Sequence, residues 1–285
     1  MYTSDMVFRD IKKLEKKGAR VKIIGKSVMG KNIYSIVTGT GNPVLFVGTH
    51  HGLEWITALF LIKAAKYFLK HPPGAEFHII PMLNPDGADI AQNKVSKSSK
   101  YYESLVKMNN GNPDFSKTWQ ANARGVDLNH NYDAYFYISK MVAKDLGYTS
   151  PGPTRYGGES PESEPESRAL VEYTKSHDFK LVVAYHSQGE VIYWDFLGKC
   201  PPKGLEWAKE LSQACGYALD VPEGVASFSG FKDYCIHKLN IPAYTVEVGL
   251  GENPLPWWKV FGIYKKNIPF MEKCAQLVFA IDNKN

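Results

Sequence analysis

The chain has 285 residues, of which 44% are hydrophobic and 22% charged, and its formal net charge is +5. These values are ordinary for a globular chain that forms one large domain or two small ones. Basic residues are spread along the sequence and are densest at Lys12, Lys13, Lys16 and Lys17. Because no basic stripe with interleaved aromatic residues is present, the sequence gives no reason to expect nucleic-acid binding.

The cysteines and the first residues bear on the cellular compartment. Cys200, Cys215, Cys235 and Cys274 form no C-x-x-C pair and match no zinc-ribbon spacing, so free thiols in a reducing compartment are expected. The first ten residues lack the apolar core of a signal peptide, and no run of about 18 apolar residues is present. We therefore expect a cytoplasmic protein without a membrane span, and the sequence makes no prediction about its oligomeric state.

The first half of the chain is expected to begin with a helix and to continue with short strands. Val7, Ile11 and Leu14 recur at helical spacing between Ser4, a residue that can cap, and Gly18. Further apolar runs predict strands at 21–24, 33–37, 44–47 and 77–80 and a helix at 56–69. Residues 84–133 carry few periodic signals, and a long segment of this kind in a compact domain is usually functional.

The second half alternates helices and strands. Helices are predicted at 163–176, 205–215 and 231–239 and from Trp257 onward, and strands at 181–185, 191–194 and 243–246. Ser163 and Glu166 have the spacing of a capping box. Because the alternation runs through the whole chain without a linker, we expect a single α/β domain over 1–285. Its sheet should be mixed, mostly parallel and twisted, with flanking helices.

Histidine and glutamate side chains, which can bind a metal or transfer a proton, follow three of the predicted strands at the point where each strand ends. The runs VLFVG, LVVAY and AYTV lead to His51 and Glu54, to His186, and to Glu247 respectively. In open α/β sheets, ligands bind outside the carboxyl ends of the strands. If the three strands run parallel, these four side chains therefore meet at one edge of the sheet.

This set has the composition of a hydrolytic zinc site. Catalytic zinc commonly takes three His or carboxylate ligands and leaves a position for water, whose pKa it lowers to about 7. A nearby carboxylate can then accept the proton and return it to the leaving group. Each residue also has an ordinary alternative: H-x-x-E occurs in surface turns, a His at a strand end is often structural, and a Glu often pairs with a base.

Four motifs resemble those of the zinc carboxypeptidase family: GTHHGLEW at 48–55, GVDLNHNYD at 125–133, AYHSQG at 184–189 and YTVEVG at 244–249. The resemblance extends over about residues 26–250, and both order and spacing agree. It implies one zinc ion per chain, held by His51, Glu54 and His186. It further implies that Glu247 is the general base for attack by a zinc-bound water. His50 is then not a ligand, since the family motif places two residues between His and Glu.

Two further segments narrow the resemblance. PGPTRYGGESPESEPES at 151–167 and WQANARGVDLN at 119–129 look like the γ-D-glutamyl-diaminopimelate peptidases, which cut bacterial cell-wall peptides. In that branch Arg124 resembles the arginine that polarises the scissile carbonyl. A guanidinium at that place would stabilise the oxyanion as its negative charge develops. A surface salt bridge is the alternative role for Arg124. The resemblance implies hydrolysis of the γ-D-glutamyl–meso-diaminopimelate bond, and in the cytoplasm such an enzyme would recycle muropeptides.

The chain departs from the family pattern in its substrate-binding positions. Many family exopeptidases hold the terminal carboxylate with an Asn-Arg pair, but here the pair is Asn129-His130, and histidine lacks the bidentate fork of arginine. The position of a mobile family tyrosine, 22 residues before the general base, is occupied by Val225. Lys232 and Asp233 fall near the specificity pocket and are expected to bind the charged groups of diaminopimelate; the alternative is an exposed helix start.

Three other functions compete with this prediction. The first is a carboxypeptidase or amidase that acts on ordinary peptides, and His130 argues against its tight carboxylate clamp. The second is a non-catalytic binding protein of the same fold, which would be expected to lose a ligand or the base. The third is the acyl-amino-acid hydrolase branch, which shares the H-x-x-E motif but not the SEPES segment or the context of Arg124.

Overall fold

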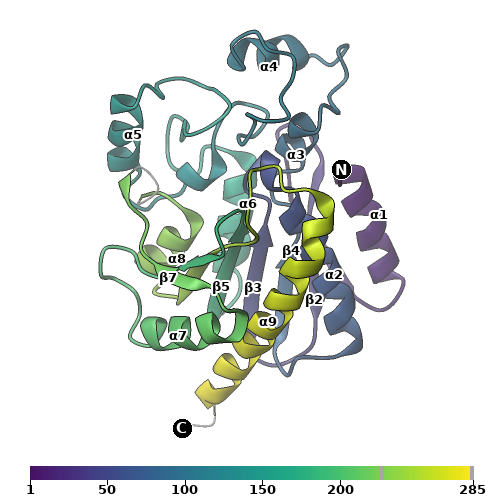
Figure 1. The fold of residues 1–285 in the computed structure, drawn as a ribbon, viewed down its shortest axis with the longest axis vertical. Coiled ribbons are helices and arrows are strands. Elements are labelled where there is room, and N and C mark those ends of the chain that lie inside the picture. The colour runs from purple at the N-terminus through teal and green to yellow at the C-terminus, as the bar shows by residue number, and fades with distance from the viewer. Residues whose placement is uncertain (225–227, 283–285) are drawn as a thin grey trace.

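The computed structural model describes residues 1–224 and 228–282. Figure 1 shows a single twisted sheet that is covered by helices on both faces. Among the described residues the sheet has eight strands in the order β1-β2-β4-β3-β5-β8-β6-β7. The strands are β1 (Arg20–Lys26), β2 (Asn32–Thr38), β3 (Pro43–Gly48), β4 (Glu76–Ile80), β5 (Leu181–His186), β6 (Val191–Tyr193), β7 (Ala218–Asp220) and β8 (Ala243–Glu247).

The sheet is parallel at its centre and mixed toward its edges. Strands β4, β3, β5 and β8 run parallel to their neighbours in that block. β2 and β6 flank the block and pair with it antiparallel, and β1 is antiparallel to β2. At the other edge β7 is parallel to β6. The predicted single α/β domain with a mixed, mostly parallel sheet is therefore confirmed.

Helices form a layer on each face of the sheet. α1 (Ser4–Glu15), α2 (Ile56–Lys70), α7 (Gly204–Cys215) and α9 (Val260–Asp282) share one buried apolar cluster, whereas α6 (Pro165–Lys175) and α8 (Phe231–Leu239) share another. The remaining helices are α3 (Pro85–Ala91), α4 (Tyr102–Met108) and α5 (Phe136–Asp145) and the short turns η1 (Gly52–Glu54), η2 (Leu128–His130) and η4 (Trp257–Lys259). No helix in the described part of the chain combines the length and apolar character needed to cross a membrane.

The central strand β3 shows why its sequence is almost wholly apolar. Successive side chains of a strand point to opposite faces of the sheet. Val44 and Phe46 accordingly belong to the cluster under α2 and α9, and Leu45 and Val47 belong to the cluster under α6 and α8. A strand covered on both faces has no polar side, which is typical of parallel sheets.

Local polar signals were less reliable than the apolar pattern. The predicted capping box at Ser163 and Glu166 is wrong: α6 begins after Glu164 without a side-chain cap. Glu166 instead accepts the backbone N–H of Val28 at 3.0 Å, 138 residues away. Likewise, Ser4 does not cap α1 but donates its hydroxyl to Asp89. In each case a distant partner replaced the local one.

Candidate active site

Three neighbouring strands end at one edge of the sheet and deliver the predicted residues there. β3 is followed by His51 and by η1, whose last residue is Glu54. β5 ends at His186 and β8 ends at Glu247, and these two residues are register partners. Since β3, β5 and β8 are parallel, the arrangement predicted from the three apolar runs is confirmed at the level of the fold.

The backbone around the first two side chains is held by close packing. A Cβ on Gly52 would lie 2.3 Å from the carbonyl oxygen of Gly87 in α3, so only glycine allows η1 to approach α3. Asn84 caps α3 by accepting the N–H of Gly87 at 2.8 Å, and its amide donates to the carbonyl of His50 at 3.0 Å. Contacts of this kind fix the turn that presents the H-x-x-E residues.

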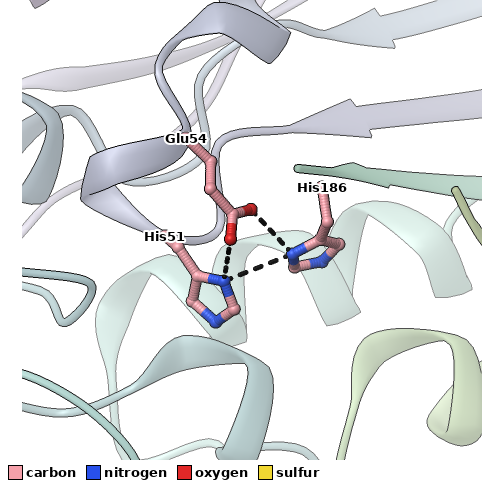
Figure 2. A group of neighbouring side chains, drawn as sticks. All are labelled: His51, Glu54 and His186. Atoms are coloured by element: carbon pink, nitrogen blue, oxygen red, sulfur yellow. Dashed lines mark hydrogen bonds and ion pairs between the residues drawn. The ribbon is translucent and has the colours of Figure 1, made fainter. Parts of the chain in front are cut away.

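Figure 2 shows that His51, Glu54 and His186 converge on a common point. His51 Nδ1 lies 2.8 Å from Glu54 Oε1, and His186 Nδ1 lies 3.0 Å from Glu54 Oε2. The two imidazole Nδ1 atoms are 3.3 Å apart. The side chains are 14%, 4% and 1% exposed in that order, so the group sits below the surface.

Charges within the group reinforce one another. Burial alone would raise the pKa of Glu54, but the imidazoles of His51 and His186 outweigh it and lower that pKa to about 2. Burial alone would lower the pKa of His51, but the carboxylates of Glu54 and Asp127 hold it well above its ordinary value. The carboxylate is therefore ionised throughout the physiological range, and the site favours positive charge at its centre.

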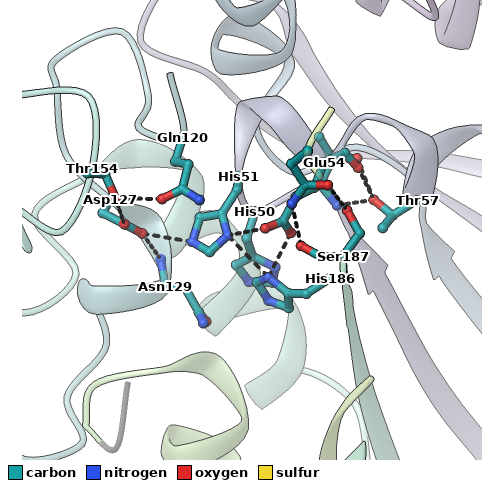
Figure 3. A network of polar contacts seen from close by, with 12 residues as sticks. His50, His51, Glu54, Thr57, Gln120, Asp127, Asn129, Thr154, His186 and Ser187 are labelled. Carbon is teal, nitrogen blue, oxygen red and sulfur yellow. Dashed lines mark hydrogen bonds and ion pairs between the residues drawn. The ribbon is translucent and has the colours of Figure 1, made fainter. Parts of the chain in front are cut away.

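Asp127 is a site residue that the sequence reasoning missed. Its Oδ1 lies 3.0 Å from His51 Nε2 and also accepts the backbone N–H of Asn129 (Figure 3). Its Oδ2 accepts the backbone N–H of Arg155. Because an ionised carboxylate only accepts, the Nε2–H of His51 donates to Asp127 and its Nδ1–H donates to Glu54, so a metal ion at Nδ1 would take the place of that second proton. The position of Asp127 inside the DLNHN motif was the available signal.

The three facing atoms suit a zinc ion. Tetrahedral zinc with nitrogen and oxygen ligands at about 2.0–2.1 Å holds its ligand atoms about 3.3 Å apart. The corresponding atoms of His51, Glu54 and His186 all lie within 4.8 Å of one another, and they form a group able to hold a metal. An orienting carboxylate behind a ligand histidine, as Asp127 is behind His51, is also usual at zinc sites.

His50 has a different environment from its neighbour. Its Nε2 lies 3.1 Å from the hydroxyl of Tyr132, and its ring stacks on that of His186 with centroids 5.2 Å apart. Burial, followed by the charges of His186 and His51, lowers the pKa of His50 well below its ordinary value. A neutral imidazole directed at Tyr132 is a structural residue beside the cluster.

Glu247 stands beside the cluster at the end of β8. Burial, followed by repulsion from the Glu54 carboxylate, raises the pKa of Glu247 well above its ordinary value, and His51 acts in the opposite direction. A carboxyl group with a raised pKa is a better proton acceptor in the neutral range than an ordinary one. Glu247 is thus a carboxyl group of raised proton affinity at the edge where β5 and β8 end.

Arg124 lies in the turn that precedes Asp127. Its backbone N–H donates to Asn122 Oδ1 at 2.9 Å, and its Nη1 lies 3.5 Å from Glu164 Oε2. The Arg124 side chain is 56% exposed. The salt bridge named as the alternative role is thus present, and the guanidinium keeps donors that face solvent.

Asn129 and His130 lie in η2, directly after Asp127. Asn129 Oδ1 accepts the backbone N–H of Phe231 at 3.2 Å, which links η2 to the start of α8. Burial lowers the pKa of His130, although the nearby Asp127 acts against it. His130 is therefore mostly neutral at pH 7 and supplies no fixed positive charge for a carboxylate.

Lys232 and Asp233 lie in the first turn of α8 and are 3% and 1% exposed. Lys232 Nζ donates to Asp233 Oδ1 and to the carbonyl of Asp195, both at 2.5 Å, and Asp233 Oδ2 accepts the N–H of Gly230. The alternative of an exposed helix start is therefore wrong, and both charges are paired inside the protein. Val225, at the position of the family tyrosine, lies outside the described residues.

Comparisons with known proteins agree with this geometry. A family profile described as zinc carboxypeptidase matches residues 6–269. The chain is also similar to gamma-D-glutamyl-L-diamino acid endopeptidase 1 of Lysinibacillus sphaericus. The two are 31% identical over 283 residues, covering 93% of this chain and 70% of that protein.

Two solved structures have the same fold. Bovine thrombin-activatable fibrinolysis inhibitor, solved with tick carboxypeptidase inhibitor, is 18% identical with a TM-score of 0.73 and is covered over 98% of both chains. Murein-tripeptide amidase from Escherichia coli O157 is 20% identical with a TM-score of 0.56, over 93% of this chain and 94% of that one. At these identities the likeness is evidence of fold.

Proposed function

The chain belongs to the zinc carboxypeptidase family of metallopeptidases, and we propose that it hydrolyses the γ-D-glutamyl–diamino acid bond of bacterial cell-wall peptides. The family membership confirms the resemblance read from the four motifs. The observation that carries the substrate class is the relative that is 31% identical over 93% of this chain, a gamma-D-glutamyl-L-diamino acid endopeptidase. The PGPTRYGGESPESEPES and WQANARGVDLN segments support the same branch.

The proposed metal ligands are His51, Glu54 and His186, which would hold one zinc ion per chain. Their facing atoms support this assignment, with separations of 2.8, 3.0 and 3.3 Å. When bound, zinc acts as a Lewis acid and acidifies a water ligand. Asp127 keeps a proton of His51 on Nε2, so that Nδ1 is the nitrogen that would release its proton and bind the metal.

Glu247 is the proposed general base and general acid. It removes a proton from the attacking water and delivers it to the amine of the diamino acid as the γ-glutamyl bond breaks. Its raised pKa, caused first by burial and then by Glu54, supports both halves of this transfer. Arg124 is proposed to donate to the scissile carbonyl oxygen, where negative charge develops in the transition state.

Asn129, His130, Lys232 and Asp233 are the proposed substrate-binding residues. A neutral His130 cannot replace the arginine clamp of ordinary carboxypeptidases, which favours a substrate with another group past the cleaved bond. Lys232 and Asp233 are buried and paired with each other. They would therefore bind the charged groups of the diamino acid from the protein side of the first turn of α8. Variants Lys232→Ala and Asp233→Ala with unchanged selectivity would remove these two from the set.

We also propose that the enzyme works in the cytoplasm on soluble wall fragments. The four cysteines are free, and three of them are buried, which suits a reducing compartment. Cell fractionation followed by immunodetection tests this location. Recovery in a cell-wall or culture-supernatant fraction would contradict it.

The test of function is mass spectrometry of products from L-Ala-γ-D-Glu-meso-diaminopimelate. The zinc-loaded protein is expected to release free diaminopimelate, and a chelator should stop the release until zinc is restored. An ordinary C-terminal peptide serves as the competing substrate. Trimming of that peptide alone would refute the cell-wall assignment, and cleavage of neither substrate would favour a non-catalytic binding protein.

A further inference from the structure

The start of α6 carries two buried carboxylates that do not cap the helix. Glu164 and Glu166 are 4% and 0% exposed, although glutamates are rarely buried without partners. No side-chain cap hydrogen bond is present at this helix start. Both side chains point instead to Asn122, whose Nδ2 donates to Glu164 Oε2 at 2.8 Å and to Glu166 Oε2 at 3.1 Å.

Asn122 shapes the turn that carries Arg124. Its Oδ1 accepts the backbone N–H of Arg124 at 2.9 Å and that of Val126 at 3.1 Å. The same Asn122 amide therefore fixes the Arg124 backbone and one oxygen of Glu164. Glu164 Oε2 lies 3.5 Å from Arg124 Nη1. The backbone of Arg124 thus contacts Asn122, and its guanidinium contacts the carboxylate that Asn122 holds.

We propose that Glu164 is a positioning residue for Arg124, and that its buried carboxylate holds the guanidinium in the orientation that meets the reacting carbonyl oxygen. This inference rests on the proposed function of Arg124. The carboxylate is itself fixed, because Ser163 Oγ donates to Oε1 at 3.0 Å and Asn122 donates to Oε2. A rigid anion of this kind limits the directions that a long, half-exposed side chain can take.

The physical reason is the freedom of the arginine side chain. Arg124 is 56% exposed, and an arginine that is free to rotate loses conformational entropy when it is ordered. If Glu164 orders the guanidinium before substrate binds, that cost is not part of the chemical step. A single contact through Nη1 leaves the other N–H donors of the guanidinium for the substrate.

The test is a double-mutant cycle with Glu164→Gln and Arg124→Ala on whichever peptide the wild-type enzyme cleaves best. Gln keeps the volume and one acceptor for Asn122, but it removes the charge that attracts Arg124. Arg124→Ala is expected to lower kcat by about 10²–10³-fold, as for loss of an oxyanion donor. Glu164→Gln should lower kcat about tenfold with KM within twofold, and it should have no further effect in the Arg124→Ala background.

Chemical rescue supplies a second readout. Guanidinium ion added to Arg124→Ala should restore part of kcat, because Glu164 can bind the free cation where the side chain stood. The rescue should fall at least tenfold in the double variant. The matched control is Glu172→Gln, which changes an exposed glutamate of the same helix and should leave both kcat and rescue unchanged.

The outcomes separate this inference from the function on which it rests. If Glu164→Gln has wild-type kcat, or lowers kcat equally in both backgrounds while Tm falls, Glu164 is only a structural residue and the inference is wrong. If Arg124→Ala is fully active, the role of Arg124 itself fails, and that result appears without any change at Glu164. Failure to cleave the diaminopimelate peptide affects only the substrate assignment, since the cycle can be run on another peptide.

Discussion

Replacement of Asp127 by Asn tests whether the second carboxylate at the site supports the metal. Asp127 accepts His51 Nε2 at 3.0 Å, and its side chain is 2% exposed. On Oδ1 it also accepts the N–H of Asn129 at 3.2 Å, and on Oδ2 that of Arg155 at 2.9 Å. An amide in this place must turn its NH₂ group either toward Arg155 or toward both His51 and Asn129, so at least one buried hydrogen bond is lost whichever way it rotates.

The expected loss in zinc affinity is about 10–100-fold, the usual effect of removing the hydrogen-bond partner of a ligand histidine. This corresponds to about 1.4–2.7 kcal/mol of binding free energy. The unsatisfied donor also costs about 1–3 kcal/mol of folding stability. Asp127→Asn should therefore bind zinc more weakly and melt at a lower temperature.

The assay is competition between the protein and a chelator of known zinc affinity, with Tm measured in the apo and zinc-loaded states. Asp195→Asn is the matched control, because the buried Asp195 carboxylate also accepts two backbone N–H groups, those of Gly198 and Cys200, neither of which belongs to a proposed ligand. That control should lose stability but keep its zinc affinity. A zinc affinity of Asp127→Asn within twofold of wild type would refute the reasoning.

Three further predictions follow from the same contacts. His51→Ala and His186→Ala should each lower the zinc content from about one ion per chain to a small fraction, whereas His50→Ala should keep it. Zinc content is measured by atomic emission after dialysis, and equal losses in all three variants would contradict the ligand assignment. Glu247→Gln should lower kcat by about 10²–10⁴-fold with unchanged zinc content, and a fully active variant would exclude it as the base. Burial raises the pKa of Glu166 from 4.5 to about 7. The stability that protonated Glu166 contributes is therefore fully present below about pH 4.5 and is lost as pH rises through about 7. The total loss in the free energy of unfolding is about 3 kcal/mol. Urea unfolding from pH 4.5 to 8 should show wild type losing that much relative to Glu166→Gln, and parallel pH curves would disprove the shift.

The apolar pattern was sufficient to predict the part of the fold that places the ligands. The predicted runs 44–47, 181–185 and 243–246 lie within β3, β5 and β8, and the residues after each run meet at one edge. This succeeded because a strand that is buried on both faces must be apolar throughout, and such strands are parallel neighbours at the centre of a sheet.

Polar contacts between distant segments were not predictable in the same way. His51 and Asp127 are 76 residues apart, and nothing in the local pattern of either residue specifies that pairing. Lys232 and Asp233 illustrate the same difficulty, because two adjacent charged residues at a helix start are usually exposed but here are buried against Asp195. Two short helices, α3 and α4, were also missed because they lie in the segment 84–133 that has few apolar repeats.

That segment explains how a long polar stretch can belong to a compact domain. Many of its backbone N–H groups donate to backbone carbonyls in turns and short helices, and buried side chains accept others: Asn84 caps α3, Asn122 accepts the N–H of Val126, and Asp127 accepts the N–H of Asn129. Buried backbone groups require partners, and here turns, short helices and buried side chains together supply them where the segment has no strand. The polar residues of this segment give it no apolar periodicity, and the same residues hold the part of the site that contains Arg124 and Asp127. Because Asn122 also accepts the backbone N–H of Arg124 and Asp127 also accepts from His51, substitutions of these two residues should affect stability and catalysis together.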